Sequence, residues 1–251
     1  TNVKDEDFVE RILVANTHDT LLCFSTLGKV YWLRAFELPT ATSRTARGRP
    51  IVNILPLADD ERINAMLPLK EFDKDKFVFM ATLKGTVKKV SLEHFSRPRT
   101  SGIIALDLNE GDRLIGAELT DGNKDVMLFS DAGKVVRFNE SHVRAMGRLA
   151  RGVRGIRLSD EQRMIALLVV GEEKVEILTA TEKGFGKRTA IDEYRISGRG
   201  GQGVISIHVN ERNGPVVRAV PVVDGDEVML ISNKGTLVRM KVDEISVIGR
   251  N

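Results

Sequence analysis

The chain has 251 residues, of which 42% are hydrophobic, so it can bury a sizeable core and does not have the composition of a disordered protein. No stretch approaches the ~20 consecutive apolar residues of a membrane helix, and the polar, acidic start is unlike a signal peptide. The single cysteine, Cys23, excludes an internal disulfide, so the cytoplasm is the expected location. The formal net charge of +3 is too small to indicate nucleic-acid binding by itself.

Five segments follow one plan, which is an apolar run, a short polar turn with a glycine, and a second alternating run. They begin at Thr20, Lys76, Asp125, Lys174 and Asp226, and their turn glycines are Gly28, Gly85, Gly133, Gly184 and Gly235. Hairpin turns often require a positive φ, which glycine adopts at little cost. Each segment is therefore expected to form a β-hairpin.

The stretches between the hairpins repeat as well. Each begins with a basic, glycine-containing loop, continues with an apolar strand, passes an acidic turn and ends in a second strand. Examples are residues 47–69, 100–120, 151–170 and 201–223. This gives about four strands in roughly 50 residues, which is typical of a bladed ring. We predict an all-β, propeller-like ring of about five to six four-stranded blades.

The two ends of the chain read as incomplete blade halves, over residues 1–16 and 226–251. Residues 8–15 (FVERILVA) resemble the last strand of a unit, and residues 226–244 form a front hairpin. We expect one domain over residues 1–251. Either the halves pair and close the ring, which would leave no exposed strand edge, or the chain is a fragment of a longer ring.

A cation recurs at one position of the repeat. Lys89, Arg137, Arg188 and Arg239 each stand four residues beyond their turn glycine, whereas the first unit has Trp32 there. Side chains alternate between the two faces of a strand, so a shared offset predicts a shared direction. We therefore predict an arc of positive charge around the ring.

The loops that follow the hairpins strengthen this charge pattern. The window RAMGRLARGVRGIR (144–157) contains five arginines and no acidic residue, while acidic residues gather in other turns, such as Asp107–Asp112. Cations on strands are usually a solvated face, but their recurrence favours a function. A curved row of cations that follows phosphates gains from counterion release. We expect largely sequence-independent binding of double-stranded DNA, by Lys29, Arg44, Arg47, Arg49, Lys88, Lys89, Arg97, Arg99, Lys134, Arg137, Arg148, Arg151, Arg154, Lys187, Arg188, Arg195, Arg199, Arg239 and Lys241.

No pattern in the sequence indicates catalysis. There is no nucleotide-binding P-loop, no cysteine–histidine cluster and no catalytic triad. Tyr31 and Tyr194 lie in repeat strands and are poor candidates for a nucleophile. The loop Gly198–Gly203 (GRGGQG) does not open a helix after a strand, so we interpret it as a basic, phosphate-contacting loop. We expect no catalytic residue, metal or cofactor in this chain, and composition alone leaves a protein-interaction propeller or a propeller hydrolase as alternatives.

Long runs across the whole chain resemble the C-terminal domain of the A protein of bacterial DNA gyrases. They include ARGRPIVNILPL (46–57), VMLFSDAGKVVRF (126–138), TATEKGFGKRTAIDEY (179–194) and GTLVRMKVDEISVIGRN (235–251). The related domain of topoisomerase IV is the nearest alternative, and the first and last of these runs favour gyrase.

The resemblance implies a β-pinwheel, a disc whose blades exchange strands and whose outer edge wraps DNA. The implied partners are the rest of gyrase A together with gyrase B, in a holoenzyme that introduces negative supercoils. ATP, Mg²⁺ and the cleaving tyrosine would then belong to other parts of that enzyme. The family's Gln-Arg-Arg-Gly-Gly-Lys-Gly-like stretch is expected just upstream of Thr1. Gly198–Gly203 resembles it in part, and its role is not carried over to that loop.

Overall fold

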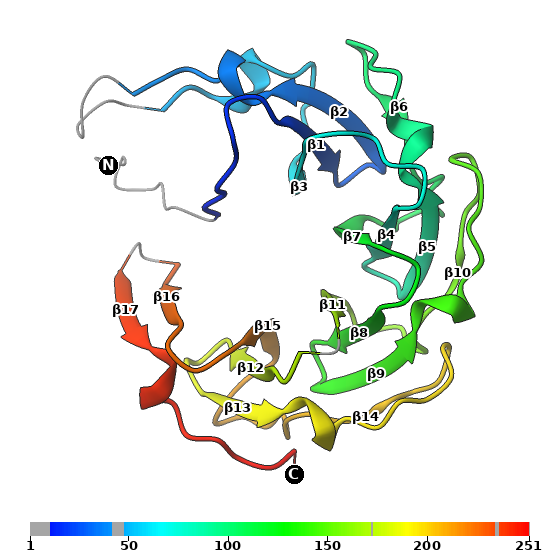
Figure 1. Cartoon of the computed structure of the whole chain (residues 1–251). Helices are drawn as coiled ribbons and strands as arrows, with labels where there is room; N and C mark the ends of the chain where they lie inside the picture. Colours follow the sequence, from blue (N-terminus) through cyan, green and yellow to red (C-terminus); the bar gives the residue numbers. More distant parts are fainter. Residues whose placement is uncertain (1–10, 42–47, 172, 234–235, 251) are drawn as a thin grey trace.

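The computed structural model describes residues 11–41, 48–171, 173–233 and 236–250. Within them the fold is all-β, as predicted, with short 3-10 turns as the only helical elements. The strands form successive antiparallel sheets around an arc (Figure 1). We name these sheets blades A to E in chain order. The predicted hairpins are β1–β2, β4–β5, β8–β9, β12–β13 and β16–β17.

Three blades have four strands, and their order is the same from the centre of the ring outwards. Blade A runs β3 (Ile63–Leu69), β1 (Thr20–Ser25), β2 (Lys29–Arg34) and β6 (Ile103–Ile104). Blade B runs β7 (Leu114–Thr120), β4 (Phe77–Thr82), β5 (Thr86–Ser91) and β10 (Val153–Arg154). Blade C runs β11 (Met164–Val170), β8 (Asp125–Ser130), β9 (Lys134–Asn139) and β14 (Val204–Ile205).

The last two blades have fewer strands among the described residues. Blade D contains β15 (Val216–Val222), β12 (Glu176–Thr181) and β13 (Gly186–Ala190), and blade E contains β16 (Glu227–Ile231) and β17 (Leu237–Lys241). The segment after β17 returns to blade D, where Ile248 N donates to Arg188 O at 2.8 Å. The prediction of four-stranded blades is therefore confirmed in blades A to C.

Each outer strand is exchanged between neighbouring blades. The strand β6 follows the hairpin of blade B in the chain but pairs with β2 of blade A. In the same way β10 pairs with β5, and β14 pairs with β9. Figure 1 shows β6, β10 and β14 on the outside of the ring and β7, β11 and β15 towards its centre. The exchange predicted from the family resemblance is thus present.

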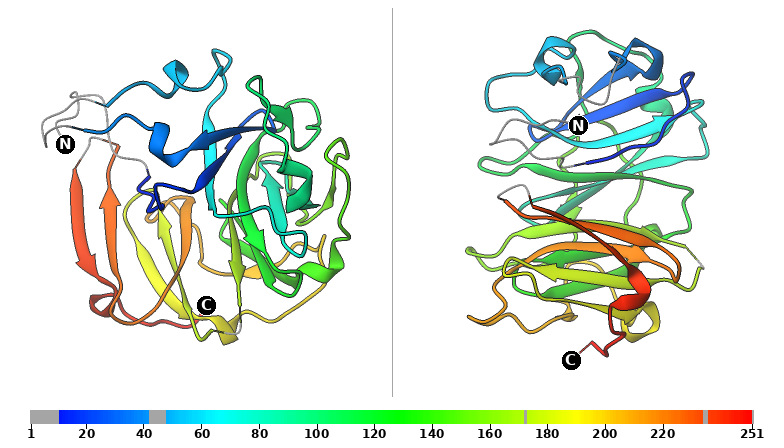
Figure 2. Two further views of the ribbon diagram at one scale, coloured as in Figure 1. Left: turned by 45° about the horizontal axis from the view of Figure 1, so that its top comes forward. Right: turned by 90° about the vertical axis from the view of Figure 1, so that its left-hand side faces the viewer.

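The hydrophobic core lies between successive sheets, which Figure 2 shows face to face around the arc. Alternate residues of β1 point to opposite sides, as strand geometry requires. Leu22 and Phe24 pack against Val78 and Met80 of blade B, whereas Leu21 and Cys23 pack on the other face of blade A. Equivalent clusters join blades B to C and C to D.

Close backbone contacts explain the turn glycines. Gly28, Gly85, Gly133 and Gly184 have positive φ, as the hairpin pattern predicts, whereas Gly235 lies outside the described residues. At Gly133 an added Cβ would lie 2.1 Å from the carbonyl oxygen of Ile207, in the segment that enters from blade D. Glycine at this turn therefore serves both the turn and the strand exchange.

Two expectations about individual strands are wrong. Residues 51–57, expected as a strand, begin with the 3-10 turn η2 (Ile51–Asn53), and Leu55 packs against the outer face of blade A. No earlier hairpin of the described residues offers them an edge. At the N-terminus, residues 11–16 form no strand, and Ile12 and Val14 are exposed. The rest of the expected half blade, residues 1–10, lies outside the described residues.

Candidate nucleic-acid interface

The predicted DNA-binding cations fall into groups that differ in exposure. Arg44 and Arg47 lie outside the described residues. The buried group is Lys88, Lys89, Lys187 and Arg188. The half-buried group is Lys29, Lys134, Arg137 and Arg148. The exposed group is Arg49, Arg97, Arg99, Arg151, Arg154, Arg195, Arg199, Arg239 and Lys241.

The cations at the repeated offset point towards the next blade and not towards solvent. Lys89 Nζ donates to Glu140 O at 3.1 Å and lies 3.6 Å from the Glu140 carboxylate. Arg137 Nη1 donates to Ile191 O at 3.0 Å, and Arg188 Nε donates to Ile245 O at 2.6 Å. Each acceptor belongs to the 3-10 turn of the following blade or ends it.

Trp32 belongs to the same series although it carries no charge. Its Nε1 donates to Phe95 O at 2.8 Å, at the end of the 3-10 turn η3 (Leu92–Phe95) of blade B. We call this set of side chains, Trp32, Lys89, Arg137 and Arg188, the blade latches. Their shared property is an N–H donor that satisfies a turn carbonyl, which would otherwise lack a partner.

The predicted arc of positive charge is therefore wrong at three positions. Lys89 and Arg188 are 6% exposed, and Arg137 is bound to Asp125 at 2.8 Å as well as to the turn carbonyls. Strand alternation gave these residues a common direction, but strand exchange turned that direction into the interface between blades. Arg239 is exposed, and its guanidinium pairs with Glu227 of its own hairpin.

Lys88 and Lys187, one position earlier in the repeat, are also buried. Lys88 is 0% exposed and Lys187 is 8% exposed. Their ammonium groups donate to backbone carbonyls of the outer loops, so neither can reach a DNA phosphate without a rearrangement. Direct DNA contact by these two lysines is thus a wrong expectation.

The exposed arginines gather on the loops that lead to the exchanged outer strands. Arg97 and Arg99 precede β6, Arg151 and Arg154 adjoin or form part of β10, and Arg195 and Arg199 precede β14. Because β6, β10 and β14 lie on the outside of the ring, these loops cross its outer edge (Figure 1). Their contact with DNA remains a prediction.

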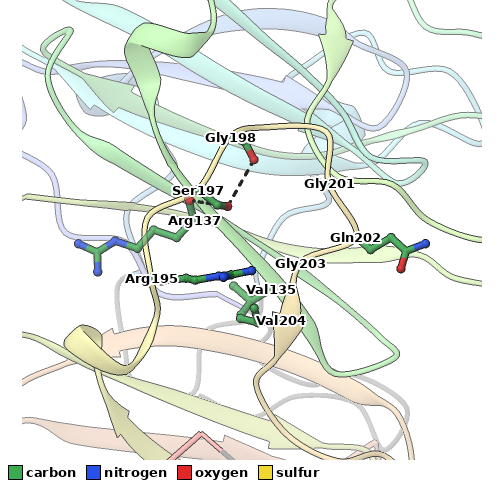
Figure 3. A pocket seen from close by; sticks show the side chains of 9 residues that line it. All are labelled: Val135, Arg137, Arg195, Ser197, Gly198, Gly201, Gln202, Gly203 and Val204. Carbon is green, nitrogen blue, oxygen red and sulfur yellow. Dashed lines mark hydrogen bonds between the residues drawn. The ribbon is translucent and has the colours of Figure 1, made fainter.

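The loop Gly198–Gly203 closes over the outer edge of blade C. With Arg195, Ser197 and Val135 it lines a cavity of about 220 Å³, shown in Figure 3. Gly203 has φ 77°, and an added Cβ there would lie 2.4 Å from Val135 O. The loop is therefore pressed against β9, with the side chain of Arg199 exposed beside it.

A further series of arginines was missed in part from the sequence. Arg148 Nη1 donates to Ile104 O at 3.0 Å, Arg199 Nη1 to Arg154 O at 3.1 Å, and Arg250 Nη1 to Ile205 O at 2.8 Å. Each acceptor is the last residue of an outer strand. Arg250 was not predicted, although it stands at the same offset from its turn glycine as Arg148 and Arg199.

The described residues offer little to catalysis. They contain no group of three or more His, Cys, Asp or Glu side chains placed to hold a metal ion. Tyr31 and Tyr194 are 1% exposed, and their hydroxyls bond to Glu61 and Ser206. None of their helices is long and apolar enough to span a membrane. The absence of a cofactor stays an expectation.

The repeat pattern matches a known family model over most of the chain. The model describes the C-terminal domain of DNA gyrase, a beta-propeller, and matches residues 19–70, 76–121, 124–171, 176–222 and 226–251. These five matches correspond to blades A to E. The chain belongs to the DNA gyrase C-terminal domain family.

Sequence relatives agree with this assignment. The chain is 59% identical over 249 residues to the gyrase A protein (GyrA-type DNA gyrase polypeptide) of Salmonella typhimurium, with 99% of the chain covered. It is 57% identical over 249 residues to the gyrase A protein of Escherichia coli K12. The chain spans only 28% of the length of these curated relatives, so it corresponds to one part of a topoisomerase polypeptide.

Solved structures share the fold with both branches of this group. The C-terminal domain of DNA topoisomerase IV superposes with a TM-score of 0.86 at 27% identity, covering 98% of the chain and 78% of that domain. The DNA gyrase A C-terminal domain superposes with a TM-score of 0.81 at 28% identity, covering 94% and 76%. Structure alone does not separate the two, whereas the identities to gyrase A proteins do.

Proposed function

We propose that this chain binds duplex DNA along the outer edge of the ring and bends it. The observation that carries this proposal is the placement of exposed arginines on successive loops that cross that edge. Arg97, Arg154 and Arg195 represent three such loops, one for each exchanged outer strand. Arginine is well suited to phosphate oxygens because its planar fork of donors can bind two of them at once.

The expected binding is electrostatic and largely independent of base sequence. Bending a site of 20–30 base pairs by 40–90° costs on the order of 1–6 kcal/mol, so several phosphate contacts must cooperate. Each neutralised phosphate steepens the dependence of affinity on salt by about 0.9 in the log–log slope. Steep salt dependence with weak sequence preference is therefore the expected signature.

Within a whole gyrase A protein, this bending would support DNA wrapping and the introduction of negative supercoils. The partners are then the rest of gyrase A, gyrase B and chromosomal DNA in the bacterial cytoplasm. The relatives that support this setting are gyrase A proteins. The cleavage of DNA and the use of ATP and Mg²⁺ would take place on other parts of the enzyme.

The test is a salt titration of binding to a doubly labelled duplex of unrelated sequence, with bending measured by energy transfer. We expect tight binding with bending at low salt, lost steeply as salt rises. The variant R97E/R154E/R195E should lose bending and at least tenfold in affinity, which corresponds to about 1.4 kcal/mol.

The matched control is R62E/R113E/R212E, which makes the same charge change at exposed positions next to the acidic turns. It should keep most of the affinity and the bending. Equal losses in both variants would contradict an outer-edge site. If the folded wild-type chain does not bind DNA at low salt, an interaction with protein partners becomes the better proposal.

A further inference from the structure

Two buried lysines form the same knot of contacts at different places on the ring. In blade B, Lys88 Nζ donates to Ala105 O at 2.8 Å and to Arg148 O, while Arg148 Nη1 donates to Ile104 O. In blade D, Lys187 Nζ donates to Gly249 O at 2.7 Å and to Arg250 O at 2.8 Å, while Arg250 Nη1 donates to Ile205 O. Each knot fastens an outer loop to the exchanged outer strand beside it.

Each knot holds two positive charges with no acidic partner. Among the described residues, no carboxylate oxygen lies within ion-pairing distance of Lys88, Arg148, Lys187 or Arg250. The nearest acid of the blade B knot, Asp107, is already paired with Arg151 at 3.1 Å. Buried charges are normally paired, because desolvation costs several kcal/mol.

The blade latch next to each knot makes the contrast clear. Lys89 is also buried, but its charge faces Glu140, and Arg188 faces Glu176 and Asp224. Neighbouring cations in the same strands are therefore neutralised where they join blades and left unneutralised beneath the outer edge. Blade C carries Val136 at the lysine position, so this lysine knot occurs in blades B and D.

We propose that the two knots are electrostatic seats for phosphodiester groups of a duplex, acting through the outer loop and not by direct contact of the lysine. This inference rests on the proposed function and makes it more specific, because it names two places along the edge where the backbone is held most strongly. An external phosphate supplies the negative charge that the fold omits. The lysine is a positioning residue in this scheme, since it fixes the loop that carries the arginine.

The titration of Lys88 supports this geometry. Burial, followed by the charge of Arg148, lowers the pKa of Lys88 to about 8, while Asp107 opposes the shift. Burial and Arg250 lower the pKa of Lys187 in the same direction, opposed by Glu193. A phosphate placed nearby favours the charged form, so it must raise both pKa values.

The experiment is calorimetry of DNA binding by the full chain near pH 8.5, in buffers of different ionisation enthalpy. We expect net proton uptake by the wild type, and its loss in K88M/K187M together with a smaller salt slope. Each lost seat should lower that slope by about 0.9. The control K124M removes an exposed lysine that pairs with Asp121, and it should retain the proton uptake.

The outcomes separate this inference from the proposed function. No DNA binding by folded wild type contradicts the function itself. Normal binding with no proton uptake, or with the same uptake in K88M/K187M, overturns the seats and leaves the function standing. Should the double variant fail to fold, carbon-13 NMR of labelled lysines in the wild type provides the decision. A lysine with a pKa near 8 that does not rise when DNA is added would also overturn the inference.

Discussion

Trp32 in blade A and Phe95 in blade B are joined by a 2.8 Å hydrogen bond from the indole Nε1 to the backbone carbonyl oxygen. The same relationship recurs from Lys89 to Glu140, from Arg137 to Ile191 and from Arg188 to Ile245. The chemistry of the donor changes from a neutral indole to an ammonium and to guanidinium groups. What the repeat preserves is therefore an N–H donor in the interface between blades.

We expect W32F to lower the stability of the chain by about 1 kcal/mol, because it keeps an aromatic ring and leaves the Phe95 carbonyl without its donor. Urea unfolding should show a lower midpoint with an unchanged m-value. DNA affinity under native conditions should stay the same, since Trp32 lies between blades. A stability equal to that of the wild type would contradict a role for the indole as a blade latch.

The Lys89–Glu140 pair should be far more important to stability than an exposed pair. Glu140 is 0% exposed, and its carboxylate also accepts from Thr120 Oγ1 at 2.7 Å and from Lys124 N at 2.9 Å. We expect E140Q to cost about 3 kcal/mol, because it leaves the buried charge of Lys89 without its partner. Chemical denaturation measures the loss, and K89M/E140Q should lose less than the two single variants added together.

The exposed pair of Arg151 and Asp107 provides the control for that measurement. Surface ion pairs typically contribute ~0–1 kcal/mol, so D107N should change the unfolding free energy by less than about 1 kcal/mol. Equal effects of E140Q and D107N would mean that burial at the blade interface does not strengthen the dependence on this charge.

The repeat made the fold predictable, while strand exchange limited what could be said of the site. Turn glycines such as Gly85 and the alternating runs around them identify the hairpins and hence an all-β ring. Alternation along β5 and β9 also shows that Lys89 and Arg137 share a face. It does not show whether that face meets solvent or the next blade, because the neighbouring 3-10 turn comes from a distant part of the chain. Trp32 was the available signal, since an indole fits an interface better than an arc of charge.

The two turn glycines Gly133 and Gly184 separate backbone strain from crowding. Both have positive φ, but a Cβ at Gly133 would lie 2.1 Å from Ile207 O, whereas nothing lies within 4 Å of one at Gly184. We expect G184A to cost about 1 kcal/mol from the left-handed conformation alone. G133A should cost clearly more, because the exchanged segment of blade D must also move. Thermal unfolding of the two variants measures the difference, and equal losses would contradict a tight crossing at Gly133.

Alkaline titration should reveal the buried Tyr31–Glu61 contact. The Tyr31 hydroxyl lies 3.0 Å from Glu61 Oε1, and burial, helped by that carboxylate, raises the pKa of Tyr31 to about 12. A pKa that is higher in the folded state than the unfolded value of about 10 gives stability that is complete below pH 10. That contribution is then lost as the pH rises towards 12. Denaturation at pH 9, 10 and 11 should show the fall, and Y31F, already less stable at pH 9, should lack the part due to Tyr31. Absorbance at 295 nm that reports two tyrosines ionising near pH 10 in the folded wild type would contradict this contact.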